Sequence, residues 1–220
     1  DTLIQSPEFA ISIALGAALT VFSATKIGMP ISTTHALVGA LLGSGLVAVG
    51  SAFNFTKLGN TFLIPLIVSP LMAALLSIIA YILFRKRSIV LGATQKTGTW
   101  VEKNSYRMLD FAHYISAGIV SFARGLNDTP KIVGLLLVIN TLDIKWGMCA
   151  VAVAMALGGL LNAKKVGELM SKKITPMNNG QGLTANLITG LLVTTASIHG
   201  LPVSTTHVSV GSIFGIGTVT

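Results

Sequence analysis

The chain contains seven long stretches of apolar residues, and this pattern constrains its fold more than any other feature. The stretches lie at 9–25, 31–53, 61–84, 112–140, 146–162, 183–198 and 203–219. A helix that spans a bilayer needs ~20 mostly apolar residues, whereas the strands of a membrane barrel alternate apolar and polar residues in short runs. With 52% hydrophobic and 10% charged residues, the pattern predicts an all-α integral membrane protein, a polytopic helical bundle.

A polar motif of six residues, which we call the hexad, occurs twice within these stretches. Residues 30–35 read Pro-Ile-Ser-Thr-Thr-His and residues 202–207 read Pro-Val-Ser-Thr-Thr-His. This indicates an internal duplication. If every stretch crosses the membrane, an odd number of crossings separates the copies, which predicts an inverted-topology repeat. If the stretches that meet at Gly28 and Gly200 are instead half-helices, the chain turns at mid-membrane, and both versions bring the hexads to a shared level.

Each hexad has the pattern of a helix start after a helix break. Proline ends the preceding helix, and Ser and Thr are favoured caps of the next one. The first N–H groups of that helix are unpaired, and inside a membrane they need a partner. An anion can supply one, so the candidate anion ligands are Ser32, Thr33, Thr34, Ser204, Thr205 and Thr206. Alternatively, these hydroxyls only cap the helices and pack small-residue helix contacts.

Three charged residues interrupt the stretch at 112–140. Arg124 and Asp128 are four positions apart, and Asp128 and Lys131 are three apart, so all three share one face of a continuous helix. Charges at that depth cost ~2.5 kcal/mol or more each and usually mark function. The net positive charge suits an anionic ligand, and Pro130 frees carbonyl groups that can coordinate a cation. Alternatively, the charges form a buried network that fixes the bundle.

Cationic residues gather in two connections between apolar stretches: Arg85, Lys86, Arg87, Lys96, Lys103 and Arg107 in one, and Lys164, Lys165, Lys172 and Lys173 in the other. The positive-inside rule predicts that both are cytoplasmic. We therefore expect a multi-pass protein of a cell membrane, with the lipid bilayer rather than nucleic acid as its partner. Small-residue faces also permit a homo-oligomer.

The segment Gly125-Leu126-Asn127-Asp128 and the two hexads resemble the inorganic phosphate transporter (PiT) family of secondary transporters. Each half of those proteins carries a Gly-Ala-Asn-Asp type signature and a later Gly-x-Pro-x-Ser-Thr-Thr-His segment. The resemblance implies that Asp128 belongs to a coupling-cation site and that phosphate is held by Ser32, Thr33, Ser204, Thr205 and Asn127. Since the first signature and the C-terminal helices are missing, the resemblance implies a fragment of a longer, bacterial low-affinity transporter of the inner membrane. The implied organisation is the end of a first repeat with a connecting helix at 1–84, a basic cytoplasmic loop at 85–108 and an incomplete second repeat at 109–220.

The expected function is secondary active transport of inorganic phosphate, as the free ion or as a metal-phosphate complex. Lys131 stands where many sodium-coupled members have asparagine, so the coupling cation stays open between H+ and Na+. Two alternatives remain: a sulfate permease of the same family, and an anion channel, which also uses small-residue helices and buried charges. Because we find no convincing nucleophile-base pair or set of metal ligands, we expect neither an enzyme nor a bound metal or cofactor.

Overall fold

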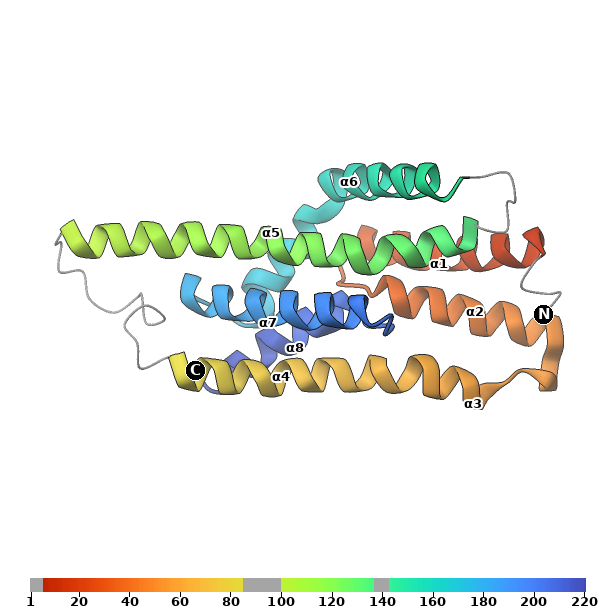
Figure 1. The fold of residues 1–220 in the computed structure, drawn as a ribbon, viewed down its shortest axis with the longest axis horizontal. Coiled ribbons are helices and arrows are strands. Elements are labelled where there is room, and N and C mark those ends of the chain that lie inside the picture. The colour runs from red at the N-terminus through yellow and green to blue at the C-terminus, as the bar shows by residue number, and fades with distance from the viewer. Residues whose placement is uncertain (1–5, 85–99, 137–142) are drawn as a thin grey trace.

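The computed structural model describes residues 6–84, 100–136 and 143–220, and every regular element within these ranges is a helix (Figure 1). Four of the described helical segments are long and apolar enough to cross a membrane: Pro7–Ile27, Thr33–Ala52, Phe55–Phe84 and Ile144–Asn162. The predicted all-α, multi-pass membrane fold is confirmed.

The first two helices, α1 (Pro7–Ile27) and α2 (Thr33–Val49), form a hairpin. Gly28 ends α1 at a φ of 86°, in the left-handed region that favours glycine. The chain turns there, and Ser32 starts α2. Figure 1 shows the two helices side by side, with their turn near the middle of the bundle and their other ends toward the N-terminus.

The last two helices, α7 (Asn179–Ile198) and α8 (Thr205–Gly217), form a second hairpin of the same kind. Gly200, at a φ of 67°, follows the end of α7, and Ser204 starts α8. This hairpin enters from the opposite end of the bundle, and its turn meets the turn of the first hairpin (Figure 1). The helix breaks predicted before both hexads are therefore present, and the two turns lie next to each other.

The remaining elements support the two hairpins. In chain order the described ones are η2 (Gly50–Ala52), α3 (Phe55–Leu58), η3 (Gly59–Leu63), α4 (Ile64–Phe84), α5 (Trp100–Leu136), α6 (Ile144–Glu168) and η4 (Leu169–Ile174). α5 has 37 residues, which corresponds to about 55 Å of helix. It packs against α7 on one side and α6 on another, while α4 packs against α8.

Glycine allows α8 to approach α4 closely. A Cβ atom at Gly211 would clash with the carbonyl oxygen of Pro70, and one at Gly215 would clash with the carbonyl oxygen of Ala74. These two glycines are four positions apart, as in the small-residue motifs that bring membrane helices together. The α4–α8 contact is therefore a contact between backbones.

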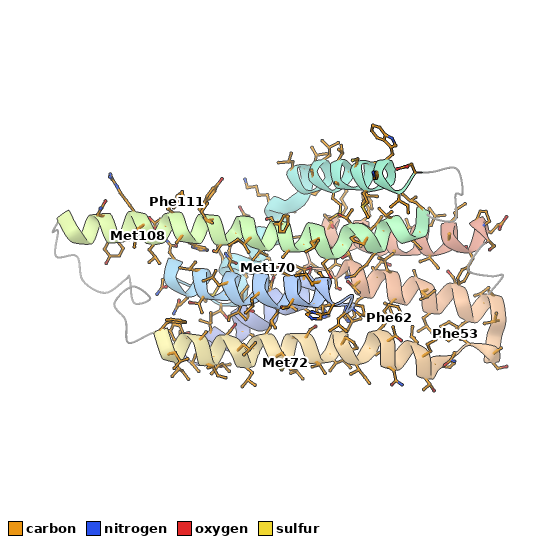
Figure 2. All side chains as sticks on the ribbon, in the orientation of Figure 1. Phe53, Phe62, Met72, Met108, Phe111 and Met170 are labelled. Atoms are coloured by element: carbon orange, nitrogen blue, oxygen red, sulfur yellow. The ribbon has the colours of Figure 1, made fainter. Side chains whose placement is uncertain are left out.

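Large apolar side chains project from the outside of the bundle (Figure 2). Among them are Met72 on α4 and Met108 and Phe111 on α5, and 65% of the surface of Phe111 is exposed. One interior cluster, in contrast, consists of Ala73, Ala123, Val193 and Val208. Small residues inside and large apolar residues outside are typical of a bundle surrounded by lipid.

Two predicted boundaries are wrong. α5 begins at Trp100 rather than at 112, so residues 100–108 of the predicted basic loop are helical. The cationic residues of the second connection also lie in helices, Lys164 and Lys165 in α6 and Lys172 and Lys173 in η4. Lysine is a good helix former, so a helix can continue where its apolar composition ends. The rest of the first loop, 85–99, and the end of the fourth stretch, 137–140, lie outside the described residues, and the cytoplasmic assignment stays a prediction.

Candidate functional site

The two hexads contact each other where the hairpin turns meet. The Thr34 hydroxyl donates to the carbonyl oxygen of Val203 at 2.9 Å, and the Thr206 hydroxyl donates to the carbonyl oxygen of Ile31 at 2.9 Å. The two threonines hold the same position in the two copies of the hexad, and so do the two acceptors. The contact is therefore reciprocal. We call this contact the hairpin junction.

Ser32 and Ser204 start α2 and α8 by the same contact. Each serine hydroxyl accepts a hydrogen bond at 3.1 Å from the N–H group three residues later, that of His35 or His207. This is the N-cap that the hexad pattern predicts. Capping uses one lone pair of each serine oxygen and fixes where each helix begins.

α2 and α8 both direct their N-terminal ends at the hairpin junction (Figure 1). The first N–H groups of a helix have no partner within the helix. Within the described part of the chain, four of these N–H groups make no hydrogen bond, those of Thr33, Thr34, Thr205 and Thr206. Free N–H groups at the positive end of a helix dipole are suited to bind an oxyanion.

Asn127 on α5 joins the second hexad to the charge cluster. Its side-chain nitrogen lies 2.9 Å from the Asp128 carboxylate, 3.1 Å from the Val203 carbonyl and 3.2 Å from the Thr205 hydroxyl, so its two hydrogens are shared among three acceptors. Its amide oxygen accepts a hydrogen bond from the Ser197 hydroxyl at 3.4 Å. Since Asn127 is 4% exposed, these contacts lie inside the protein and hold the residue in one orientation.

The charge cluster also lies at this junction. Asp128 is 2% exposed, and its carboxylate is 3.6 Å from Arg124 Nε and 3.8 Å from Lys131 Nζ. Lys131 Nζ additionally donates to the Thr34 hydroxyl and to the Val203 carbonyl, both at 2.9 Å. Arg124 lies at the edge of the cluster with 46% of its side chain exposed. The predicted single face for all three charges is thus present.

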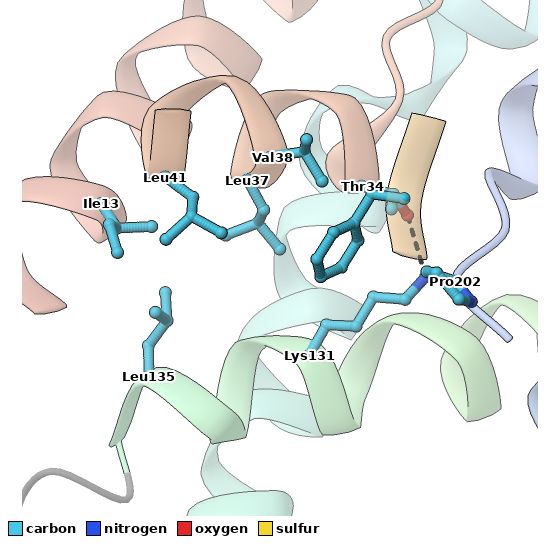
Figure 3. Close-up of a pocket in the computed structure, with 9 residues that line it drawn as sticks. Ile13, Thr34, Leu37, Val38, Leu41, Lys131, Leu135 and Pro202 are labelled. Atoms are coloured by element: carbon cyan, nitrogen blue, oxygen red, sulfur yellow. Dashed lines mark hydrogen bonds between the residues drawn. The ribbon is translucent and has the colours of Figure 1, made fainter. Parts of the chain in front are cut away.

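An apolar pocket of about 230 Å³ opens beside the junction (Figure 3), and it is lined by Ile13, Thr34, Leu37, Val38, Leu41, Phe62, Lys131, Leu135 and Pro202. The hydrogen bond between Lys131 and Thr34 lies at its edge. A phosphate ion in such a pocket would lose its hydration and find few donors. We therefore place the candidate anion site at the helix ends rather than in the pocket.

The structure brings most of the sequence-predicted residues together, but with different contacts. The hydroxyl groups of Thr34 and Thr206 donate hydrogen bonds to protein carbonyl groups. Within the described part of the chain, the Thr33 hydroxyl makes no hydrogen bond. Sequence reasoning missed the carbonyl groups of Ile31 and Val203. Every residue has a carbonyl group, so the only available signal was their place directly after a helix-breaking proline.

The hairpins and their polar junction define the class of this protein. It is a multi-pass membrane protein in which broken helices enter from opposite ends and meet, an arrangement that membrane transporters use for ion sites. The chain belongs to the phosphate transporter family, whose sequence model matches residues 2–220.

Similar proteins agree with this family. A sulfate permease, CysP of Bacillus subtilis, is 30% identical over 91% of this chain and 53% of its own length. A probable low-affinity inorganic phosphate transporter of Rhizobium meliloti is 29% identical over 99% of this chain and 65% of its own. A solved structure titled the sodium-dependent phosphate transporter matches 96% of this chain and 70% of its own with a TM-score of 0.80 and 25% identity. The chain thus spans between about half and two thirds of these two curated relatives.

Proposed function

We propose that the protein containing this chain is a secondary active transporter of inorganic phosphate. The observation that carries the proposal is the meeting of the α2 and α8 N-terminal ends, with their free N–H groups, beside a buried Asn127. The anion binds between these ends and draws on the Thr33 and Thr205 hydroxyls. Membership of the phosphate transporter family supports phosphate as the anion.

The transport cycle needs the hairpins to separate and close again. In the described arrangement the hexads are bonded directly to each other through Thr34 and Thr206, so an anion enters only when one side of this contact opens. Movement of one hairpin against the other then exposes the site to alternate sides. A proton or cation bound beside Asp128 lowers the cost of moving negative charge across the membrane.

Uptake of radiolabelled phosphate by proteoliposomes that contain the full-length protein tests this proposal. Proton and sodium gradients are imposed separately, with and without Mg2+ to distinguish the free ion from a metal-phosphate complex. We expect saturable accumulation of phosphate that one of the gradients drives. Absence of uptake under every gradient would contradict the proposal and would mean that the buried charges only stabilise the helical bundle.

Sulfate is the second candidate, because the Bacillus subtilis relative named above is a sulfate permease. Both anions are tetrahedral, but phosphate near neutral pH carries a protonated oxygen that can donate a hydrogen bond, whereas sulfate only accepts. The junction contains a strong acceptor with remaining capacity, the buried Asp128 carboxylate. A site that pairs with a substrate hydroxyl discriminates against an analogue that lacks it, so excess sulfate is expected to leave phosphate uptake unchanged.

An anion channel is the alternative of another class. A channel also uses buried charges and small-residue helices, but it dissipates gradients. Phosphate accumulation above its external concentration supports the carrier, whereas passive flux that only follows the electrochemical gradient of phosphate supports the channel.

A further inference from the structure

Lys131 places a positive charge where three parts of the hairpin junction meet. Its ammonium group donates to the Thr34 hydroxyl of the first hairpin and to the Val203 carbonyl of the second, both at 2.9 Å. The Asp128 carboxylate, on the same face of α5, is 3.8 Å from the same nitrogen. A single cationic group thus contacts oxygen atoms from α2, from the turn before α8 and from α5.

These oxygen atoms are of the kinds that bind alkali cations. Hard cations take carboxylate and carbonyl oxygens as ligands, and carbonyl groups of unwound segments coordinate sodium in broken-helix transporters. Val203 lies in such a segment, directly before the Ser204 cap of α8. A lysine ammonium is a compact point charge with three donors and no acceptor, so it satisfies the same set of oxygens as a sodium ion.

The charge balance supports the same reading. Asp128 is 2% exposed, and a buried carboxylate needs a nearby positive charge. Arg124 lies 3.6 Å away but is 46% exposed, whereas the Lys131 side chain is 21% exposed. Water weakens the first pair more than the second, so Lys131 is the main countercharge of Asp128 within the described part of the chain.

We infer that the Lys131 ammonium is a resident cation that takes the place of one mobile sodium ion, and that a short neutral side chain at position 131 creates a sodium requirement. The inference rests on the proposed transport function for its uptake readout, and goes beyond it by assigning the choice of coupling ion to one residue. The fixed ammonium leaves the proton as the driving ion.

Phosphate uptake by the full-length protein in sodium medium and in choline medium, under one proton gradient, tests the inference. Wild-type uptake is expected to be equal in the two media. For Lys131→Ala, sodium at roughly ten times its Kd fills about nine tenths of the emptied sites, so uptake should be high in sodium medium and low in choline medium. Arg124→Ala is the matched control, because it removes a cation that pairs with the same carboxylate but opens no space between the hairpins. Phosphate uptake by this control is expected to be equal in sodium and choline media.

Sodium binding is measured separately, by thermal unfolding of the purified proteins in lipid nanodiscs. An ion that binds only the native state raises Tm, so sodium should raise the Tm of Lys131→Ala relative to choline and leave that of wild type unchanged. Lys131→Ser serves as a second variant if the alanine variant does not fold.

The inference is overturned if sodium raises neither uptake by the variant nor its Tm, or if wild type responds to sodium as strongly as the variant. If wild-type protein carries no phosphate at all, the proposed function fails. The sodium-dependent shift in Tm still decides the role of Lys131 in that case, so the two failures are distinguishable.

Discussion

His35 and His207 face each other across the hairpin junction, with ring centroids 4.2 Å apart and ring planes tilted by 53°. They hold the same position in the two hexads, yet their hydrogen bonding differs. His35 Nδ1 lies 2.9 Å from the Ser32 hydroxyl oxygen, and the described residues contain no equivalent contact for the His207 ring. The reciprocal bonding of the junction therefore does not extend to these rings.

This asymmetry predicts unequal effects of replacing the two histidines. Both His35→Ala and His207→Ala remove the ring contact, but only His35→Ala also removes a side-chain hydrogen bond, which is worth about 1 kcal/mol. We expect a larger drop in Tm for His35→Ala in thermal unfolding of the purified protein. Equal drops would mean that the Ser32 contact contributes nothing to stability.

Gly211 is predicted to be intolerant of any side chain. Gly211→Ala places a methyl group against the carbonyl oxygen of Pro70, and because both groups belong to helix backbones the overpacking should cost about 1–3 kcal/mol. Gly118→Ala on α5 is the control, since a Cβ there meets nothing within 4 Å. The Tm of the two variants is compared, and a Gly211→Ala protein as stable as the control would refute the close α4–α8 contact.

Replacing Ser204 and Thr205 together by alanine is predicted to abolish phosphate uptake without preventing membrane insertion. The double variant loses the cap of α8 and the hydroxyl that Asn127 contacts. Ser6→Ala removes a comparable cap, from α1, and should retain uptake. Loss of one N-cap costs about 1 kcal/mol, so both proteins should insert and fold. Wild-type uptake by the double variant would contradict the anion-site proposal.

Asn127→Ala is predicted to reduce phosphate uptake by at least about tenfold, the factor that corresponds to 1.4 kcal/mol. It leaves the buried Asp128 carboxylate and Thr205 hydroxyl without their shared donor. Asn162→Ala is the control, because Asn162 is exposed and, among the described residues, bonds only to its own helix, at Gly158. Initial uptake rates normalised to protein in the membrane measure the effect, and equal rates for both variants would exclude a binding role for Asn127.

Sequence patterns predicted the helical membrane fold and the broken helices correctly, because both depend on local properties. Apolar runs of bilayer length and a proline after a glycine leave few alternatives for a chain in lipid. The start of α5 at Trp100 was missed for the opposite reason. Residues 102–105 of α5 are all polar or charged. An apolar composition shows where a helix lies in lipid, but it does not show how far the helix continues beyond the lipid.

The candidate site was predicted less completely. The spacing of Arg124, Asp128 and Lys131 placed them on one face, and the repeat indicated that the hexads act together. No spacing rule indicated that Thr34 would bond across to Val203, because that contact depends on how two hairpins far apart in the sequence meet. Long-range contacts of this kind follow from the packing of α4, α5 and the hairpins together.

The carbonyl oxygen of Val203 accepts hydrogen bonds from Thr34, Asn127 and Lys131. A main-chain oxygen is present whatever amino acid is encoded at that position, so no codon change can delete it. Mutational scanning can therefore test this acceptor only by replacing the side chains that donate to it. Sequence differences among relatives can likewise change these hydrogen bonds only by changing the donor residues. Direct proof of its importance requires an alteration of the backbone itself, such as an ester bond introduced after position 203 by chemical synthesis.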